Sequence, residues 1–255
     1  MHKKTMIAGS LGIIFLLVIS FSGCVNQEEK IDPAIQKIKD ADKLVVGTST
    51  PYEPMEYTDE NGDIIGFDID VAREIASALD VKLEIKDLVF DDLLDAVEDG
   101  SVDIAIAAIT ITIDRSEQVL FSNAYLNAGQ VIIVNDTNKD INSEKDLKDK
   151  IVGVQNGTTS EEEALKYTNS SLVRSYDNYT AALEAILAGE INAIVIDYPA
   201  GVGLIRDTSG LEIVGDPFTN ELYGIAIKKG NSAVKTEIDK VIASISIEEL
   251  GNKWF

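Results

Sequence analysis

Two oppositely charged residues each follow an apolar run, and together they could hold a small zwitterion. Arg115 lies just beyond the run AAITITI, and a guanidinium can hold a carboxylate by two parallel charge-assisted hydrogen bonds. Asp197 directly follows INAIVI and suits an ammonium group. The hydroxyl of Thr110, inside the first run, can fill a remaining lone pair of the carboxylate. Burying both charges of an amino acid is costly unless each finds a partner, so this set favours a site for a free amino acid.

The stretch NGTTSEEE, residues 156–163, adds hydrogen-bond donors to this set. It begins a predicted helix, where the first backbone amides and the Thr159 hydroxyl are free for an anion. The same residues are explained equally well as a capping box. Ordinary explanations exist for the other residues too: Arg115 among acidic neighbours is typical of a surface residue, and Asp197 could begin a turn before Pro199. Residue types alone leave both explanations open.

Composition excludes several classes of protein. The 255 residues include 44 Asp+Glu against 22 Lys+Arg, and the net charge of −22 argues against binding to nucleic acid or to anionic lipid surfaces. The single histidine, His2, and the single cysteine, Cys24, both lie near the start. The folded body therefore lacks Ser-His-Asp and Cys-His nucleophiles and histidine metal sites, and no disulfide can form within the chain. Carboxylate-only Ca²⁺ or Mg²⁺ sites stay open, but we expect neither a metal nor a cofactor.

The first 24 residues have the layout of an export signal. A basic start, MHKKTM, precedes the apolar stretch IAGSLGIIFLLVISF and two small residues before Cys24, as in a lipoprotein signal. The apolar stretch is shorter than the roughly 20 residues that span a bilayer comfortably. We expect a signal peptide over 1–23, a lipid on Cys24, and a tether with a short helix over 24–43. The protein would then be exported and anchored to the outer face of the membrane; the alternative is an uncleaved membrane anchor.

Strand-like and helix-like segments alternate from Lys43 onward, which predicts parallel sheets covered by helices. Aliphatic or alternating patterns predict strands over 43–49, 81–88, 102–110, 150–158, 172–177 and 191–199. Apolar residues at helical spacing predict helices over 68–80, 90–101, 160–168 and 178–190. The fold class expected from this alternation is α/β.

A weak internal repeat suggests two similar lobes. Residues 90–108 align without a gap on residues 179–197 with three identities, which sets Ala108 opposite Asp197. Ligands of open parallel sheets bind outside the carboxyl ends of the strands. Two lobes facing one another would therefore direct both strand ends into one cleft. The tail from Glu221 is too short for a third domain and is expected to return to the first lobe, so the chain would cross twice and form a hinge.

The chain resembles the polar-amino-acid family of extracellular solute-binding proteins, which deliver ligands to ATP-binding-cassette (ABC) importers. The motifs that carry the resemblance span residues 44 to 255 in order: VVGTSTPYEPMEY, GFDIDVAREIA, VDIAIAAITITIDRSEQVLFSNAY, GVQNGTTSEE, AILAGEINAIVIDYP, YGIAIKKG and GNKWF. The resemblance implies a two-lobe periplasmic-binding-protein fold, each lobe a mostly parallel sheet flanked by helices. Lobe 1 would comprise 44–125 plus 225–255 and lobe 2 would comprise 129–221, with a two-stranded hinge near 125–129 and 221–225.

The resemblance also implies roles for individual residues. Arg115 would take the ligand carboxylate, assisted by Thr110 and Thr159. Asp197 would take the ammonium, together with Thr110 and the backbone carbonyl of Ala108. Tyr52 and Phe90 match the aromatic positions that flank the ligand side chain, although such residues are more often part of a core.

Two departures from the family pattern concern specificity. Relatives that take lysine, arginine or histidine, and some glutamine binders, carry an Asp where this chain has Ser49, so a cationic side chain would lose its main partner. Gln155 stands where some glutamine binders have Lys. With Tyr52 and Phe90, these residues would form a neutral pocket with hydrogen-bonding capacity. We therefore expect a neutral polar or small amino acid as the ligand.

Two other functions compete with this one. The fold also hosts dehydratases that act on prephenate-like cyclic acids, which need an acid in the cleft, here Glu or Asp. A sensory receptor that signals without transport is the other alternative. We expect a monomeric, non-enzymatic protein whose partners are a free L-amino acid, the membrane through the lipid anchor, and the membrane subunits and cytoplasmic ATPase of an ABC permease.

Overall fold

The protein is seen in a computed structural model that describes residues 2, 31–206 and 208–255. One compact unit, Asp32–Phe255, carries all the elements below. The predicted signal peptide, the predicted lipid on Cys24 and most of the predicted tether lie outside the described residues. The short helix expected before residue 43 is present as α1 (Pro33–Asp40), whose N-terminus is capped by the side chain of Asp32.

The first sheet has five strands in the order β4-β1-β5-β14-β6. Its strands are β1 (Lys43–Thr48), β4 (Lys82–Asp87), β5 (Ile104–Ala105), β6 (Leu120–Phe121) and β14 (Ala226–Ile227). β1 pairs in parallel with β4 and with β5, whereas β14 is antiparallel to β5 and to β6. The parallel half of this sheet ends beside the loops that carry the candidate site.

The second sheet also has five strands, in the order β10-β9-β11-β8-β12. Its strands are β8 (Gln130–Asn135), β9 (Val152–Gln155), β10 (Val173–Tyr176), β11 (Ala193–Asp197) and β12 (Leu211–Val214). β9 is parallel to β10 and β11, and β8 is antiparallel to β11 and β12. Both sheets are therefore mixed, and the expectation of mostly parallel sheets was too simple. β8 and β14 are the first strands after the chain passes from one sheet to the other, and each runs against its neighbours.

Two short strands connect the sheets. β7 (Leu126–Asn127) lies on the way to the second sheet and β13 (Leu222–Tyr223) on the way back, and the two pair antiparallel. They fall within the segments predicted as a hinge; hinge motion and the lobe boundaries stay predictions. A further pair, β2 (Tyr57–Thr58) and β3 (Ile64–Ile65), forms a small ribbon after β1.

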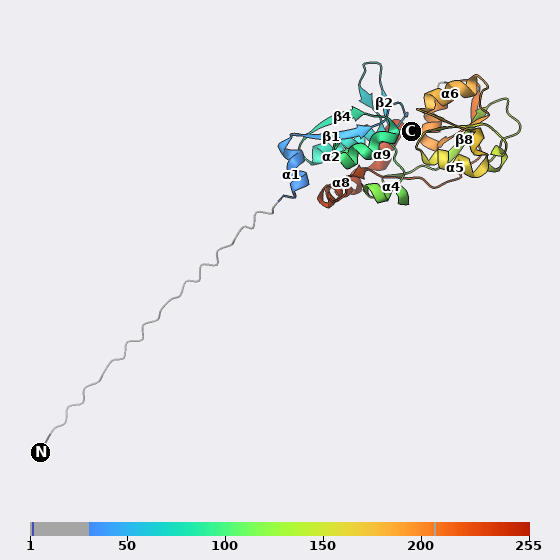
Figure 1. The fold of residues 1–255 in the computed structure, drawn as a ribbon. Helices are drawn as coiled ribbons and strands as arrows, with labels where there is room; N and C mark the ends of the chain where they lie inside the picture. Colours follow the sequence, from blue (N-terminus) through green and yellow to red (C-terminus); the bar gives the residue numbers. More distant parts are fainter. Residues whose placement is uncertain (1, 3–30, 207) are drawn as a thin grey trace. The chain divides into compact units, whose positions relative to one another are not determined.

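Helices cover both sheets (Figure 1). The α-helices after α1 are α2 (Phe67–Ala78), α3 (Leu93–Asp99), α4 (Ile113–Gln118), α5 (Thr159–Tyr167), α6 (Tyr179–Leu187), α7 (Tyr198–Arg206), α8 (Ser232–Ser244) and α9 (Ile247–Trp254). The 3₁₀ helices are η1 (Phe90–Asp92), η2 (Glu144–Leu147) and η3 (Ser170–Leu172). Helices α8 and α9, at the end of the chain, pack against α2. None of the helices in the described part of the chain is long and apolar enough to span a bilayer.

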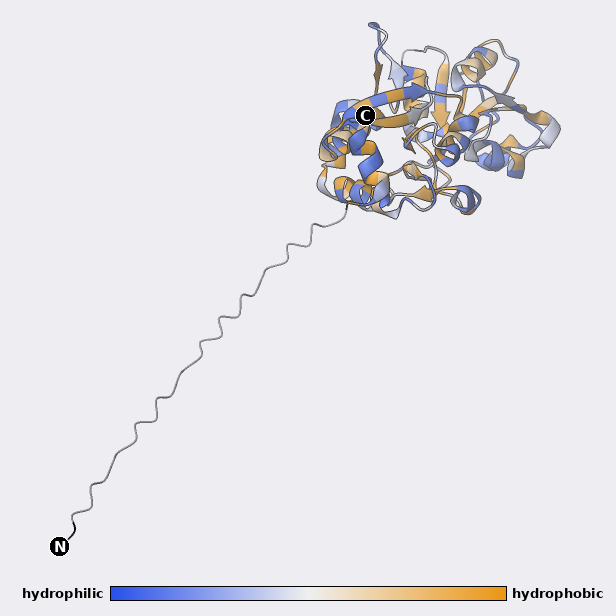
Figure 2. Ribbon diagram, turned by 60° about the vertical axis from the view of Figure 1, so that its left-hand side comes forward, coloured by the Kyte–Doolittle hydropathy of each residue, from blue (hydrophilic) through white to orange (hydrophobic). Residues whose placement is uncertain are grey.

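The strand pattern explains the layered cores. In β5 and its continuation, Ile104 and Ile106 belong to a buried cluster on one face, and Ala105 and Ala107 belong to a cluster on the other. Successive side chains of a strand point to opposite faces, so a strand buried on both faces is apolar throughout. The same alternation occurs along β8 and β11 of the second sheet. Figure 2 colours the ribbon by hydropathy and shows apolar residues in orange within strands and helices.

The region around the opening motif differs from its prediction. A continuous strand was expected over 102–110, but β5 ends at Ala105. Ala108 adopts a left-handed backbone, with φ of 49°, which is incompatible with a strand. Helix α4 was not predicted, because six residues are too few to show a helical period. Arg115 therefore projects from a short helix that begins eight residues after β5 ends.

Candidate functional site

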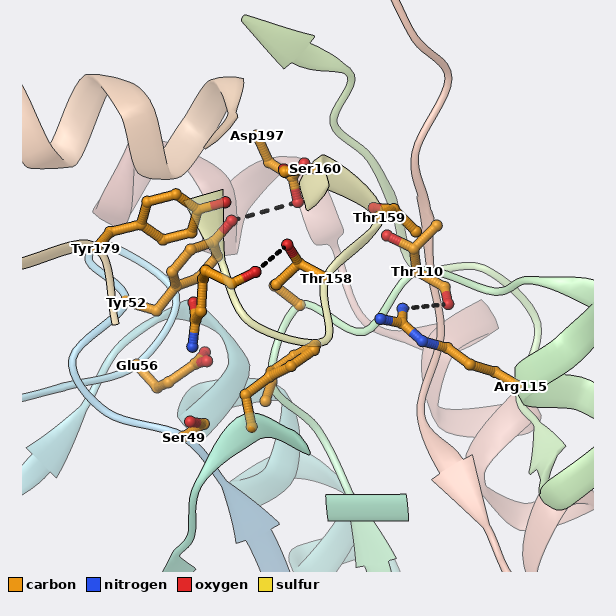
Figure 3. Close-up of a pocket in the computed structure, with 14 residues that line it drawn as sticks. Ser49, Tyr52, Glu56, Thr110, Arg115, Thr158, Thr159, Ser160, Tyr179 and Asp197 are labelled. Atoms are coloured by element: carbon orange, nitrogen blue, oxygen red, sulfur yellow. Dashed lines mark hydrogen bonds between the residues drawn. The ribbon is translucent and has the colours of Figure 1, made fainter. Parts of the chain in front are cut away.

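One pocket gathers all nine residues predicted to contact the ligand (Figure 3). It encloses about 350 Å³ of space, open solvent included. The predicted residues that line it are Ser49, Tyr52, Phe90, Ala108, Thr110, Arg115, Gln155, Thr159 and Asp197. Five further residues line it and were not predicted: Glu56, Ala107, Thr158, Ser160 and Tyr179. Contact with a ligand stays a prediction for the nine residues that were expected to line the pocket.

Arg115 is held by backbone oxygens from both sides of the pocket. The Thr112 side chain caps α4 by accepting from the Arg115 backbone amide at 3.1 Å. In the guanidinium group, Nη1 donates to the carbonyl of Thr110 and Nη2 to the carbonyl of Gly157, both at 2.9 Å. Its carbon lies 5.5 Å from the centre of the Phe90 ring, a cation–π distance.

The charge of Arg115 is left without an acidic partner. Among the ion pairs of residues 31–206 and 208–255, none within 4.0 Å includes its guanidinium. Burial lowers the pKa of Arg115 below its ordinary value, and the nearby acids, Glu162 first, oppose that shift. A guanidinium stays charged at neutral pH and has five N–H donors. Arg115 can therefore still take a carboxylate.

Asp197 presents one free carboxylate oxygen to the pocket. It is the last residue of β11 and is 5% exposed. Its Oδ2 accepts hydrogen bonds from the hydroxyl of Tyr52, at 3.3 Å, and from that of Tyr223. Its Oδ1 is buried and has no hydrogen-bond partner in the part of the chain that the structure describes. Burial raises the pKa of Asp197 to about 7, against which the Tyr223 hydrogen bond acts. A cationic donor at Oδ1 would relieve this cost.

The two threonines at the start of α5 make different hydrogen bonds. Thr158 is the N-cap and accepts from the amide of Glu161 at 3.4 Å, so a capping role is its structural explanation. The Thr159 hydroxyl donates to Glu221 Oε2 at 3.0 Å and accepts from Gln130 Nε2 at 3.1 Å. Its proton is therefore engaged by Glu221, and the backbone amide at this first helical position is the better donor for a ligand.

Glu56 is the most consequential residue that sequence reasoning missed. Its side chain is 1% exposed, and its Oε2 is buried without a partner among the described residues. Figure 3 shows Glu56 and Ser49 at the end of the pocket away from Asp197. Burial raises the pKa of Glu56 well above its ordinary value, and the charge of Asp68 adds to the shift. The one sequence signal was an acid four residues after Tyr52 within a motif that the resemblance singled out.

Aromatic residues form a wall of the pocket. The rings of Tyr52 and Tyr179 lie 5.8 Å apart between centres, and the Tyr179 hydroxyl donates to the carbonyl of Val195 at 3.1 Å. Gln155, at the end of β9, donates to the carbonyl of Asp177 at 3.3 Å and is nearly buried. Such a surface offers stacking contacts and hydrogen bonds without a fixed charge.

No metal site accompanies this pocket in the described residues: they contain no group of three or more His, Cys, Asp or Glu side chains that could hold an ion. The acids that line the pocket, Glu56 and Asp197, belong to different elements. The arrangement is that of a binding pocket with one guanidinium group and two buried carboxyl groups.

Comparisons with known proteins place the chain in a family. The chain is 31% identical over 243 residues to the ABC transporter glutamine-binding protein GlnH of Bacillus subtilis, covering 91% of this chain and 88% of the relative. It is 32% identical over 251 residues to the glutamine-binding protein of Geobacillus stearothermophilus, covering 90% and 95%. Both relatives match along nearly their whole length.

Solved structures show the same fold. An ancestral arginine-binding protein bound to arginine superposes with a TM-score of 0.80 at 39% identity, covering 84% of this chain and 98% of that one. An ancestral amino-acid-binding protein described as a precursor of cyclohexadienyl dehydratase superposes with a TM-score of 0.79 at 32% identity, covering 87% and 99%.

The family model that matches the chain covers nearly all of the compact unit. It describes bacterial extracellular solute-binding proteins and matches residues 44–255. This is the same range over which the sequence motifs run in order. Three observations lead to one assignment. They are the α/β architecture of two sheets, the pocket lined by charged side chains, and these matches. The chain belongs to the bacterial extracellular solute-binding proteins, family 3.

Proposed function

We propose that this protein captures a free L-amino acid outside the cytoplasm and delivers it to an ABC importer. The observation that carries the proposal is the presence in one pocket of Arg115 and Asp197: among the described residues, Arg115 has no acidic partner and Asp197 Oδ1 has no hydrogen-bond partner. The spacing of a carboxylate and an ammonium on one carbon suits such a pair. The relatives named for glutamine and arginine support the same class of ligand.

The ligand backbone would be held at both of its charges. Its carboxylate would lie on the guanidinium of Arg115, with Thr110 and the first amides of α5 as further donors. Its ammonium would donate to Asp197 Oδ1 and to the carbonyl of Ala108. Burial desolvates the charged groups of Arg115 and Asp197, and contact with the two charges of the ligand would offset that cost.

The ligand side chain would lie between Tyr52 and Phe90 and end at Glu56. The expectation of a neutral ligand rested on Ser49, which removes the carboxylate that basic amino acids need at that position. Glu56 provides another carboxyl at the same end of the pocket. We therefore propose an amino acid whose side chain donates N–H hydrogen bonds, either a neutral amide or a guanidinium.

Delivery would depend on closure of the pocket around the ligand. Ligand binding would shift an equilibrium between open and closed forms toward the closed form. The hinge would be β7 and β13, and the lobes would be residues 44–125 plus 225–255 and residues 129–221. The permease would recognise the closed form. Export with a lipid on Cys24, and action as a monomer, complete the proposal.

A dehydratase acting on a prephenate-like acid is the second candidate. The two buried acids of the pocket, Glu56 and Asp197, both have raised pKa values, as a general acid requires. The likeness to a dehydratase precursor points the same way. Asp197, however, is held by two tyrosine hydroxyls in a position that suits ion pairing.

A thermal-shift screen against the twenty amino acids and prephenate separates the two candidates. A ligand that binds only the folded chain raises the melting temperature according to its affinity. A large shift with L-glutamine or L-arginine, and recovery of that compound unchanged, is the expected result. A shift with prephenate alone, with turnover of the compound, would replace transport by catalysis.

A further inference from the structure

We propose that Asp68 is a positioning residue of the binding site, which holds the Ala108 backbone in place for the ligand ammonium and ties it to the first crossing between the sheets. The inference rests on the proposed function, since it assigns a role within amino-acid binding. Asp68 does not line the pocket and would act only through Ala108.

The contacts of Asp68 are few and specific. It is the second residue of α2 and is fully buried. Its Oδ2 accepts from the backbone amide of Ala108 at 2.7 Å and from the hydroxyl of Tyr125 at 2.9 Å. Its Oδ1 is buried with no partner among the described residues. A buried acid held in this way, without a cation, costs stability, which calls for a role beyond packing.

Ala108 needs such support because its backbone is strained. It has a φ of 49°, in the left-handed region that residues other than glycine seldom adopt. A hydrogen bond from its amide to a carboxylate is stronger than one to a neutral oxygen. Holding that amide fixes the backbone of Ala108, a residue that lines the pocket and whose carbonyl is the proposed partner of the ligand ammonium.

Tyr125 connects this support to the segments between the sheets. It directly precedes β7, and its ring lies 6.2 Å from that of Tyr223 in β13. Tyr223 in turn donates to Asp197, and the backbone at Thr110 forms a bridge with Tyr223. Each proposed partner of the ligand ammonium is therefore connected to a tyrosine of a different crossing: Ala108 to Tyr125 through Asp68, and Asp197 directly to Tyr223. Through Asp68, binding of the ammonium would depend on the geometry of the first crossing.

The test compares two ligands on the purified chain by calorimetry. The first is the L-amino acid that ranks first in the thermal-shift screen, and the second is the same compound without its α-amino group. Asp68→Ala removes the oxygen that accepts both hydrogen bonds and should raise the Kd of the amino acid by about 10-fold or more, while changing that of the desamino compound by less than about threefold. Asp68→Asn keeps one acceptor oxygen and should restore most of the lost affinity.

Asp70→Ala is the matched control. Asp70 lies two residues along the same helix and accepts from Lys253 and Trp254 of α9, far in sequence from the pocket residues. It should lower the melting temperature and leave both Kd values within about twofold of wild type. If Asp68→Ala does not fold, Tyr125→Phe removes one of the two donors, keeps the ring, and should weaken the amino acid selectively by about threefold.

The outcomes separate the inference from the function on which it rests. Equal weakening of both ligands by Asp68→Ala, or by Tyr125→Phe where that variant replaces it, would show a merely structural role and overturn the inference. Unchanged affinity for both ligands would do the same. A wild-type chain that shows no shift with any amino acid would overturn the proposed function, and the inference with it.

Discussion

The hydroxyl of Tyr223 donates a hydrogen bond to Oδ2 of Asp197, which joins the second crossing segment to the last residue of β11. The hydroxyl of Tyr52, which follows the first strand of the other sheet, donates to the same oxygen. Asp197 is therefore held from two parts of the fold, and its Oδ1 has no hydrogen-bond partner among the described residues. An acid that is fixed by donors on one oxygen and left empty on the other is preorganised for a cation.

Replacement of Arg115 by Ala should weaken amino-acid binding by about 100-fold or more, because a carboxylate in the pocket would lose its charged partner. The fold should be kept, since among the described residues the guanidinium donates to two backbone carbonyls and lies over the Phe90 ring, and none of these contacts joins it to an acid. Arg174→Ala is the control: Arg174 is an exposed arginine that lies 3.9 Å from Glu190. Calorimetry should show unchanged binding for the control, and near-normal binding by Arg115→Ala would remove the carboxylate clamp.

Replacement of Asp197 by Asn should stabilise the empty protein at alkaline pH while abolishing tight binding. The folded-state pKa of Asp197 is about 7, against 3.8 without the fold, so the unfolded chain ionises this group first. Its contribution to stability is present below about pH 4 and is lost as the pH rises through about 7. Scanning calorimetry should show a smaller loss of melting temperature between acidic and alkaline pH in the variant than in wild type. An equal loss in both would mean that Asp197 is not the group responsible.

Glu56→Gln should change the ranking of ligands more than their overall affinity. A carboxyl at the far end of the pocket favours a guanidinium, and an amide there favours another amide. The variant should lose arginine binding by about 10-fold more than glutamine binding. Ser49→Asp, which adds a carboxylate at the same end, should shift the ranking toward basic amino acids. An unchanged ranking in both variants would place the side-chain end of the ligand elsewhere.

Gly203→Ala should hinder closure without disturbing either sheet. A Cβ at Gly203, in α7, would overlap the backbone carbonyl of Glu53, which follows the first strand of the other sheet. The variant should bind about 10-fold more weakly by calorimetry. Gly201→Ala makes the same change two residues earlier, where the new methyl group would meet Ile196 and Val131 of the second sheet at 3.1 and 3.2 Å. That control should lose stability and keep its affinity; equal affinity of the two variants would exclude an effect on closure.

Arg115 and Asp197 stand out in the sequence because each is a charged residue close behind an apolar run, but their types alone left an ordinary surface or turn role open. Their roles in the predicted site came from the resemblance of the surrounding motifs to a known family. The alternation of strands and helices predicted the α/β class, and the predicted helices over 68–80 and 178–190 correspond to α2 and α6.

Glu56 and Asp68 could not be identified in this way. Their burial results from the packing of the segment around Met55 against the start of α2, where the amide of Asp68 donates to the carbonyl of Met55 at 3.0 Å. No local pattern encodes such a contact between distant segments. The left-handed Ala108 was hidden for a similar reason: its amide bonds to the carboxyl of Asp68, 40 residues earlier in the chain, and its own side chain does not favour that conformation.

The central claim is that both charges of the ligand are captured at once. Calorimetry of the wild-type chain with its preferred amino acid, with the same compound lacking the carboxylate, and with that lacking the amino group tests this claim directly. We predict that loss of either group weakens binding by about 100-fold or more, since either Arg115 or Asp197 would then be left buried without a partner. Binding of either truncated compound within about 10-fold of the amino acid would contradict the account.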